Sequence, residues 1–113
     1  MSADPTAGMD AIVGELATTY APDAPLATAL RDDWLRGHGD KTARLALAWA
    51  REQVRLAVAE VLQHARAKRT LRPDGDVDTL AWLLLAACEA LAHEPASAVS
   101  DRTQALVAFL RAP

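Results

Sequence analysis

The chain has 113 residues, of which 51% are hydrophobic and 24% are charged. This is the composition of a soluble globular protein, and the length suits one hydrophobic core and no second domain. The formal net charge of -3 argues against autonomous binding of DNA or RNA, because nucleic-acid-binding domains are usually basic. The single cysteine, Cys88, excludes an internal disulfide framework and a cysteine-based zinc site.

The balance of residue types favours helices over strands. The sequence contains 26 Ala and 16 Leu, but one Ile, one Tyr and one Phe. Ala and Leu are strong helix formers, whereas β-branched and aromatic residues favour strands. We therefore expect an all-α fold, a five-helix bundle without a sheet.

The N-terminal third is predicted to hold a flexible end and two helices. Residues 1–8 (MSADPTAG) are small and polar, and they lack the basic and apolar regions of a signal peptide. A single helical domain is expected to follow at 9–113. Its first helix is predicted from Met9 to Tyr20, on one-face apolar spacing, and its second from Asp23, as N-cap, to Gly37.

Three further helices are predicted in the rest of the chain. The third runs from Asp40 to about Arg69, with an apolar face that extends from Leu47 to Ala65. The fourth begins after Asp76 and ends near His93. The fifth begins at Ser97 or Ser100 and ends at Arg111.

The fourth helix has apolar residues on two sides. One stripe is formed by Val77, Leu80, Leu84, Cys88 and Leu91, and a second by Trp82, Leu85, Ala86 and Ala92. A helix with two apolar stripes needs two surfaces to pack against, and in a domain of this size we expect the second to be another subunit. The residues predicted for this dimer interface are Trp82, Leu85, Ala86, Ala92, Leu106, Phe109 and Leu110.

The sequence gives little support for catalysis, so we expect no enzyme, no metal site and no cofactor. The histidines His38, His64 and His93 lie far apart, and no HExxH, GxSxG or glycine-rich phosphate loop is present. Cys88 lies on the most apolar helix, where a small buried side chain is a better interpretation than a nucleophile. The longest apolar run, Leu80 to Cys88, is far shorter than the roughly 20 residues of a membrane span, and a cytoplasmic location is expected.

A family resemblance is carried by the stretch from Arg51 to Leu91. It reads REQVRLAVAEVLQHARAKRTLRPDGDVDTLAWLLLAACEAL, a long amphipathic helix with a basic end, a Leu-Arg-Pro-Asp turn and an Asp-capped apolar helix. Pro73 ends the long helix, Asp74-Gly75 supports a tight reversal, and Asp76 caps the next helix, which sets the two helices antiparallel. The stretch resembles the C-terminal effector-binding and dimerisation domain of TetR-type transcriptional regulators, over about Arg51 to Leu110.

The resemblance implies a domain that binds a small effector within its helices. It also implies that Val77 to His93 and Ser97 to Arg111 pair with the same helices of a second subunit as a four-helix bundle. The sequence departs from the family at Ala90, where glycine is usual. It also has an acidic region, Met1 to Asp40, where the family has a helix-turn-helix module. We therefore expect a ligand-sensing and dimerisation domain of a TetR-type regulator that does not itself contact nucleic acid.

The predicted effector site lies among the second, third and fourth helices. Trp34 and Trp49 are expected to supply flat apolar walls, and Gln53 a hydrogen bond, for a small hydrophobic effector. The alternative is that both tryptophans pack a core, in which case the chain is a helical protein-interaction or dimerisation module without a ligand. A reachable polar cavity favours the first interpretation and a solid core the second.

Overall fold

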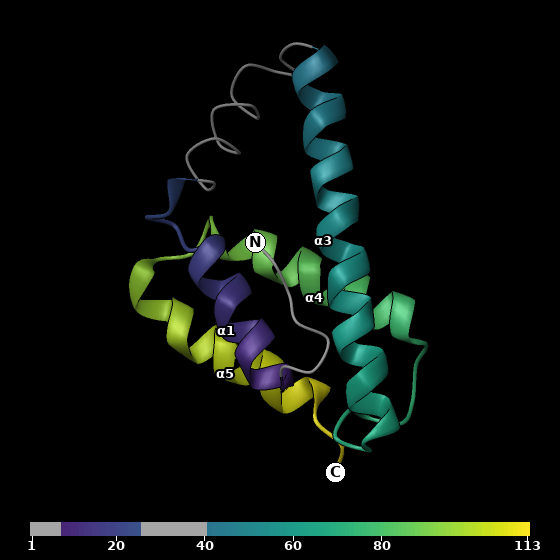
Figure 1. The fold of residues 1–113 in the computed structure, drawn as a ribbon. Helices are drawn as coiled ribbons and strands as arrows, with labels where there is room; N and C mark the ends of the chain where they lie inside the picture. The colour runs from purple at the N-terminus through teal and green to yellow at the C-terminus, as the bar shows by residue number, and fades with distance from the viewer. Residues whose placement is uncertain (1–7, 26–40) are drawn as a thin grey trace.

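The computed structural model of the chain describes residues 8–25 and 41–113 (Figure 1). They form the helices α1 (Met9–Thr19), α3 (Lys41–Ala67), α4 (Val77–Leu91) and α5 (Val99–Leu110), with a short 3-10 turn, η1 (Ala96–Ala98), before α5. These residues contain no β-strand beyond one isolated bridge between Leu71 and Arg111. The all-α class is thus confirmed for the described ranges.

Each predicted helix in the described ranges is present, with ends shifted by a few residues. The second predicted helix lies, from Leu26 onward, outside the described residues, so the count of five is not established. The fourth helix begins where predicted, because the Asp76 carboxylate accepts hydrogen bonds from the Thr79 backbone N–H (2.9 Å) and side-chain hydroxyl (2.6 Å). These hydrogen bonds, the side-chain one first, hold the pKa of Asp76 below its usual value.

The turn between α3 and α4 is held together by Arg66. Its guanidinium donates hydrogen bonds to the carbonyl oxygens of Gly75 (2.7 Å), Arg72 (2.8 Å) and Asp74 (3.3 Å). Gly75 has a φ of +83°, a conformation that glycine adopts without steric cost. Residues 73–75 therefore form a bend at the position predicted for the reversal.

The helices α3 and α4 cross instead of running antiparallel as predicted. Arg51 forms an ion pair with Glu89 (2.8 Å), and Arg55, one turn later, lies 3.6 Å from the carboxylate of Asp78. Those two acids are about 16 Å apart along α4, given a rise of 1.5 Å per residue. Neighbouring turns of α3 thus reach opposite ends of α4, which passes behind α3 in Figure 1. The turn chemistry fixes where α3 ends and where α4 starts, but not the angle at which the two helices pack.

One apolar core joins the four helices. Its fully buried side chains come from α1 (Ile12, Leu16), from α3 (Val58, Leu62) and from α4 and α5, and no polar or charged residue of the described ranges is buried. In Figure 1, α1 lies beside α5, and α3 and α4 close the other side. The remaining members of the core are Met9, Val13, Tyr20, Ala59, Val61, Ala65, Leu71, Val77, Leu80, Ala81, Leu84, Leu85, Cys88 and Leu110.

The N-terminal half of α3 contributes little to this core. The predicted apolar face packs inward only from Val54 onward, while Ala50 is exposed and Leu47 is half-buried. Leu45, Trp49 and Leu56 are exposed, and at 100° per residue they lie on the side of α3 opposite the core. In Figure 1 the first turns of α3 extend well beyond α4.

Candidate functional site

An apolar surface among the described residues spans α4 and α5. On α4 the side chains of Trp82 and Leu83 are 53% and 40% exposed, and on α5 that of Phe109 is 49% exposed. Between and around them lie small or half-buried apolar residues. These are Ala86, Ala87, Ala90, Ala105 and Leu106. We call these eight residues together the α4–α5 face.

A continuous groove runs along this face. The helices α4 and α5 run in opposite directions there, since Leu83 shares a hollow with Phe109 and Ala90 shares one with Arg102. The narrow hollow has a volume of about 210 Å³, the wider one about 470 Å³, and both are lined by Ala87 and Leu106. The narrow hollow is otherwise lined by Leu83, Leu84, Phe109 and Leu110, with no polar side chain.

Charged residues lie only at the two ends of the groove. At one end the Arg72 guanidinium stacks 4.3 Å from the centre of the Phe109 ring and forms hydrogen bonds of 2.9 and 2.7 Å with the carboxylate of Asp74. The Arg72 hydrogen bond holds the pKa of Asp74 below its usual value. At the other end Arg102 pairs with Glu94 at 3.1 Å. An apolar centre with a charged rim is typical of protein–protein interfaces.

The structure divides the seven residues predicted for a dimer interface into two groups. Trp82 and Phe109 are exposed, and Ala86 and Leu106 are half-buried. Leu85, Ala92 and Leu110, however, are 1%, 2% and 2% exposed, so they already pack inside the chain's own fold. The predicted interface therefore loses these three positions.

Four members of the α4–α5 face are absent from the seven residues predicted for the dimer interface. Leu83, Ala87, Ala90 and Ala105 are not among the predicted interface residues, although Leu83, Ala90 and Ala105 are exposed. A helix that is apolar on every side gives no periodic signal for which side faces the core. Which positions of α4 are buried and which are exposed depends on how α3 and α5 pack against it.

The predicted effector residues are not enclosed by the described part of the chain. Trp34 lies outside it, Trp49 is 68% exposed on the outer side of α3, and Gln53 is exposed as well. A cavity of about 250 Å³ does lie between the N-terminal half of α3 and α4, near the predicted place. It is lined by Ala48, Arg51, Glu52, Arg55, Trp82 and Leu85.

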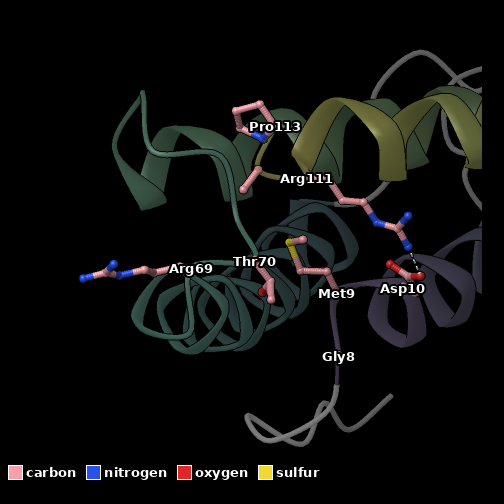
Figure 2. Close-up of a pocket in the computed structure, with 8 residues that line it drawn as sticks. Gly8, Met9, Asp10, Arg69, Thr70, Arg111 and Pro113 are labelled. Carbon is pink, nitrogen blue, oxygen red and sulfur yellow. Dashed lines mark hydrogen bonds and ion pairs between the residues drawn. The ribbon is translucent and has the colours of Figure 1, made fainter.

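Another cavity lies where the start of α1 meets the end of the chain (Figure 2). Its volume is about 540 Å³, and two arginines line it. Arg111 pairs with Asp10, and in Figure 2 Arg69 points away from the other labelled side chains. Neither guanidinium is thus directed into the cavity as a free anion ligand.

Metal-binding clusters and a reactive thiol are both lacking among the described residues. They contain no cluster of three or more His, Cys, Asp or Glu residues placed to hold a metal ion. Cys88 is fully buried, and this burial, with a smaller contribution from Glu89, raises the pKa of its thiol to about 12. A thiol of that pKa is protonated at neutral pH and is a poor nucleophile.

The chain was compared with family models, curated proteins and solved structures. No family model, no curated protein and no solved structure matches the chain. Among the helices formed by the described residues, none combines the length and the apolar character that crossing a bilayer requires.

Proposed function

We propose that the chain is a homodimerising regulatory module, the dimerisation and ligand-sensing domain of a TetR-type regulator. The observation that carries this proposal is the α4–α5 face, on which Trp82, Leu83 and Phe109 are exposed around small apolar side chains. Soluble monomers rarely leave a contiguous apolar patch of this kind in water, and large ones mark interaction sites.

The shape of the face suits a second copy of the same two helices. The 15 residues of α4 give it a length of about 22 Å. Two helices side by side are about 20 Å wide. Two such faces in contact make a four-helix arrangement, in which helices commonly pack 8–10 Å apart. The resemblance of the sequence to TetR-type domains supports pairing through these helices.

Ligand sensing is supported by one feature, the cavity between α3 and α4. Trp82 supplies an aromatic wall, and Arg51 and Arg55 supply polar groups, near the predicted effector site. The core itself contains no buried polar side chain among the described residues, which favours the alternative of a dimerisation module without a ligand. Dimerisation is expected both for a ligand-sensing domain and for a dimerisation module without a ligand.

A pair of matched glutamate substitutions tests the dimerisation. Leu83 lies at the centre of the α4–α5 face and is 40% exposed, while Leu45 is 61% exposed on the outer side of α3. Because neither side chain is buried, both variants are expected to fold. Leu83→Glu should give a monomer in light scattering after gel filtration, and Leu45→Glu should remain dimeric. A Leu83→Glu variant as dimeric as the wild type contradicts the proposal.

Tryptophan fluorescence tests the ligand. A panel of small hydrophobic compounds should quench the emission saturably in the wild type and in Trp49→Phe, but not in Trp82→Phe, if the cavity beside Trp82 is the site. No saturable quenching by any compound leaves the dimerisation module without a ligand as the function.

A further inference from the structure

We propose that the cavity between α3 and α4 binds an uncharged, planar aromatic compound that carries a hydrogen-bond acceptor. This inference rests on the ligand sensing of the proposed function and names the chemical class of the ligand. The residues that line the cavity are Ala48, Arg51, Glu52, Arg55, Trp82 and Leu85.

The apolar part of this lining suits a flat ring. Trp82 is 53% exposed, whereas Leu85 is 1% exposed and belongs to the core. An aromatic ring that stacks on Trp82 removes exposed apolar surface from water and takes up a geometry that aromatic pairs prefer. The cavity volume of about 250 Å³ is enough for one or two rings, since a cavity of roughly 150 Å³ holds benzene.

The two arginines of the lining supply hydrogen-bond donors. A guanidinium has five N–H donors and no acceptor. Among the described residues, Arg51 donates two hydrogen bonds to Glu89 (3.1 and 2.8 Å), and Arg55 donates one to Glu52. Donors of both side chains therefore remain for an acceptor on the ligand, and the ion pair between Arg51 and Glu89 need not be broken.

The charges around the cavity disfavour an ionic ligand. Arg51 pairs with Glu89, and Arg55 pairs with Glu52 and lies 3.6 Å from Asp78, so two guanidiniums lie among three carboxylates. An anion would meet the formal excess of one negative charge. A cation would meet two guanidiniums and one carboxylate in the lining itself.

A ligand without any polar atom also fits poorly. The side chains of Arg51 and Arg55 are 50% and 26% exposed, so water reaches their N–H groups. A purely apolar ligand would displace that water without replacing its hydrogen bonds, which costs free energy. A carbonyl oxygen or a ring nitrogen in the plane of the ligand replaces one of them.

Equilibrium dialysis at neutral pH tests the class of ligand. The probes are coumarin, chromone and quinoline, which are uncharged two-ring compounds with an acceptor, and a coumarin carboxylate, which adds an anionic group to the same rings. We expect coumarin to bind once per chain and the carboxylate to bind about tenfold more weakly. A wild type that binds none of the three uncharged probes overturns the inference. Binding of the carboxylate as tight as that of the best uncharged probe overturns it as well.

Alanine substitution of two tryptophans tests the place of binding. Trp82→Ala should weaken the binding of coumarin by about tenfold or more, because the stacking surface is lost. Trp49→Ala is the matched control, because Trp49 is 68% exposed on the outer side of α3, and it should leave the Kd unchanged. Equal Kd values for the two variants overturn the inference.

Methionine substitution of the arginines tests the hydrogen bond. Arg51→Met or Arg55→Met should weaken the binding of coumarin by about tenfold, but not that of naphthalene, which has two fused rings and no acceptor. Arg102→Met is the control, because Arg102 is an exposed arginine that pairs with Glu94 away from this cavity. Losses that are the same for coumarin and naphthalene in both cavity variants overturn the role of the acceptor.

The outcomes distinguish this inference from the proposed function. A carboxylate that binds tightly and is lost in Trp82→Ala overturns the uncharged class but leaves ligand sensing at this cavity. A wild type that dimerises and binds none of the probes overturns the inference but not the dimerisation. A wild type that is monomeric and binds coumarin beside Trp82 overturns the dimerisation but not the inference.

Discussion

Trp82 and Leu85 lie one turn apart on α4, yet Trp82 is 53% exposed and Leu85 is 1% exposed. The boundary between the core and the open face of α4 therefore runs between these two side chains. Leu85 contributes to the stability of the single chain, whereas about half of the surface of Trp82 stays exposed to solvent.

Alanine substitutions of these two residues should separate folding from association. Leu85→Ala removes a fully buried side chain and is expected to cost about 2–5 kcal/mol in the free energy of unfolding. Trp82→Ala should cost far less when measured at concentrations at which the wild type is monomeric. Urea unfolding followed by circular dichroism measures both values. Equal losses contradict the assignment of Leu85 to the core and Trp82 to the surface.

The N-cap of α4 should make stability depend on acid pH. Since folding lowers the pKa of Asp76, its contribution is present above its unfolded pKa of about 3.9 and is lost as the pH falls through the lower folded value. Asp76→Ala should therefore lower the Tm at pH 7, whereas wild type and variant should converge in strong acid. Thermal unfolding at several pH values follows the difference. A difference in Tm that stays constant down to strong acid contradicts a charged cap.

Cys88 should report on opening of the core. Burial raises the pKa of its thiol to about 12, so the folded chain should react with a thiol reagent at pH 8 only as fast as it unfolds. Denaturant should make the single thiol fully reactive, which provides the control. Rapid, complete modification of the native chain contradicts the packing of α4 described above.

The turn before α4 should depend on the planar fork of Arg66. Arg66→Lys keeps the charge but cannot reach three carbonyl oxygens at once, and both it and Arg66→Ala should lose about 1–2 kcal/mol of stability. Arg69→Ala is the comparison, since no hydrogen bond of its side chain is seen and it points away from its neighbours in Figure 2. Chemical denaturation gives the values, and a stable Arg66→Lys variant argues against the role of the fork.

Much of the local structure could be predicted because local chemistry determines it. The high Ala and Leu content predicts the helices. The start of α4 is predicted by Asp76, whose carboxylate accepts a hydrogen bond from the first turn of the helix. The link from Arg66 to the turn could not be predicted, because it depends on how α3 ends in space. The buried face of a helix can be predicted from sequence periodicity only where polar residues lie on the opposite face.

The candidate site could be predicted in part for the same reason. The surplus of apolar residues on α4 predicts a second contact surface, and Trp82 and Phe109 do lie on it. Leu85, Ala92 and Leu110 were assigned to that surface, but they are buried inside the chain's own fold. Which side of an entirely apolar helix stays open depends on the packing angle, and no residue of the turn specifies that angle.

If the chain pairs through the α4–α5 face, its native mass must be that of a dimer. Sedimentation equilibrium of the whole chain over nanomolar to high micromolar concentrations should give a mass that rises to twice the chain mass of 12.1 kDa. A mass that stays at 12.1 kDa up to high micromolar concentration contradicts pairing of the chain.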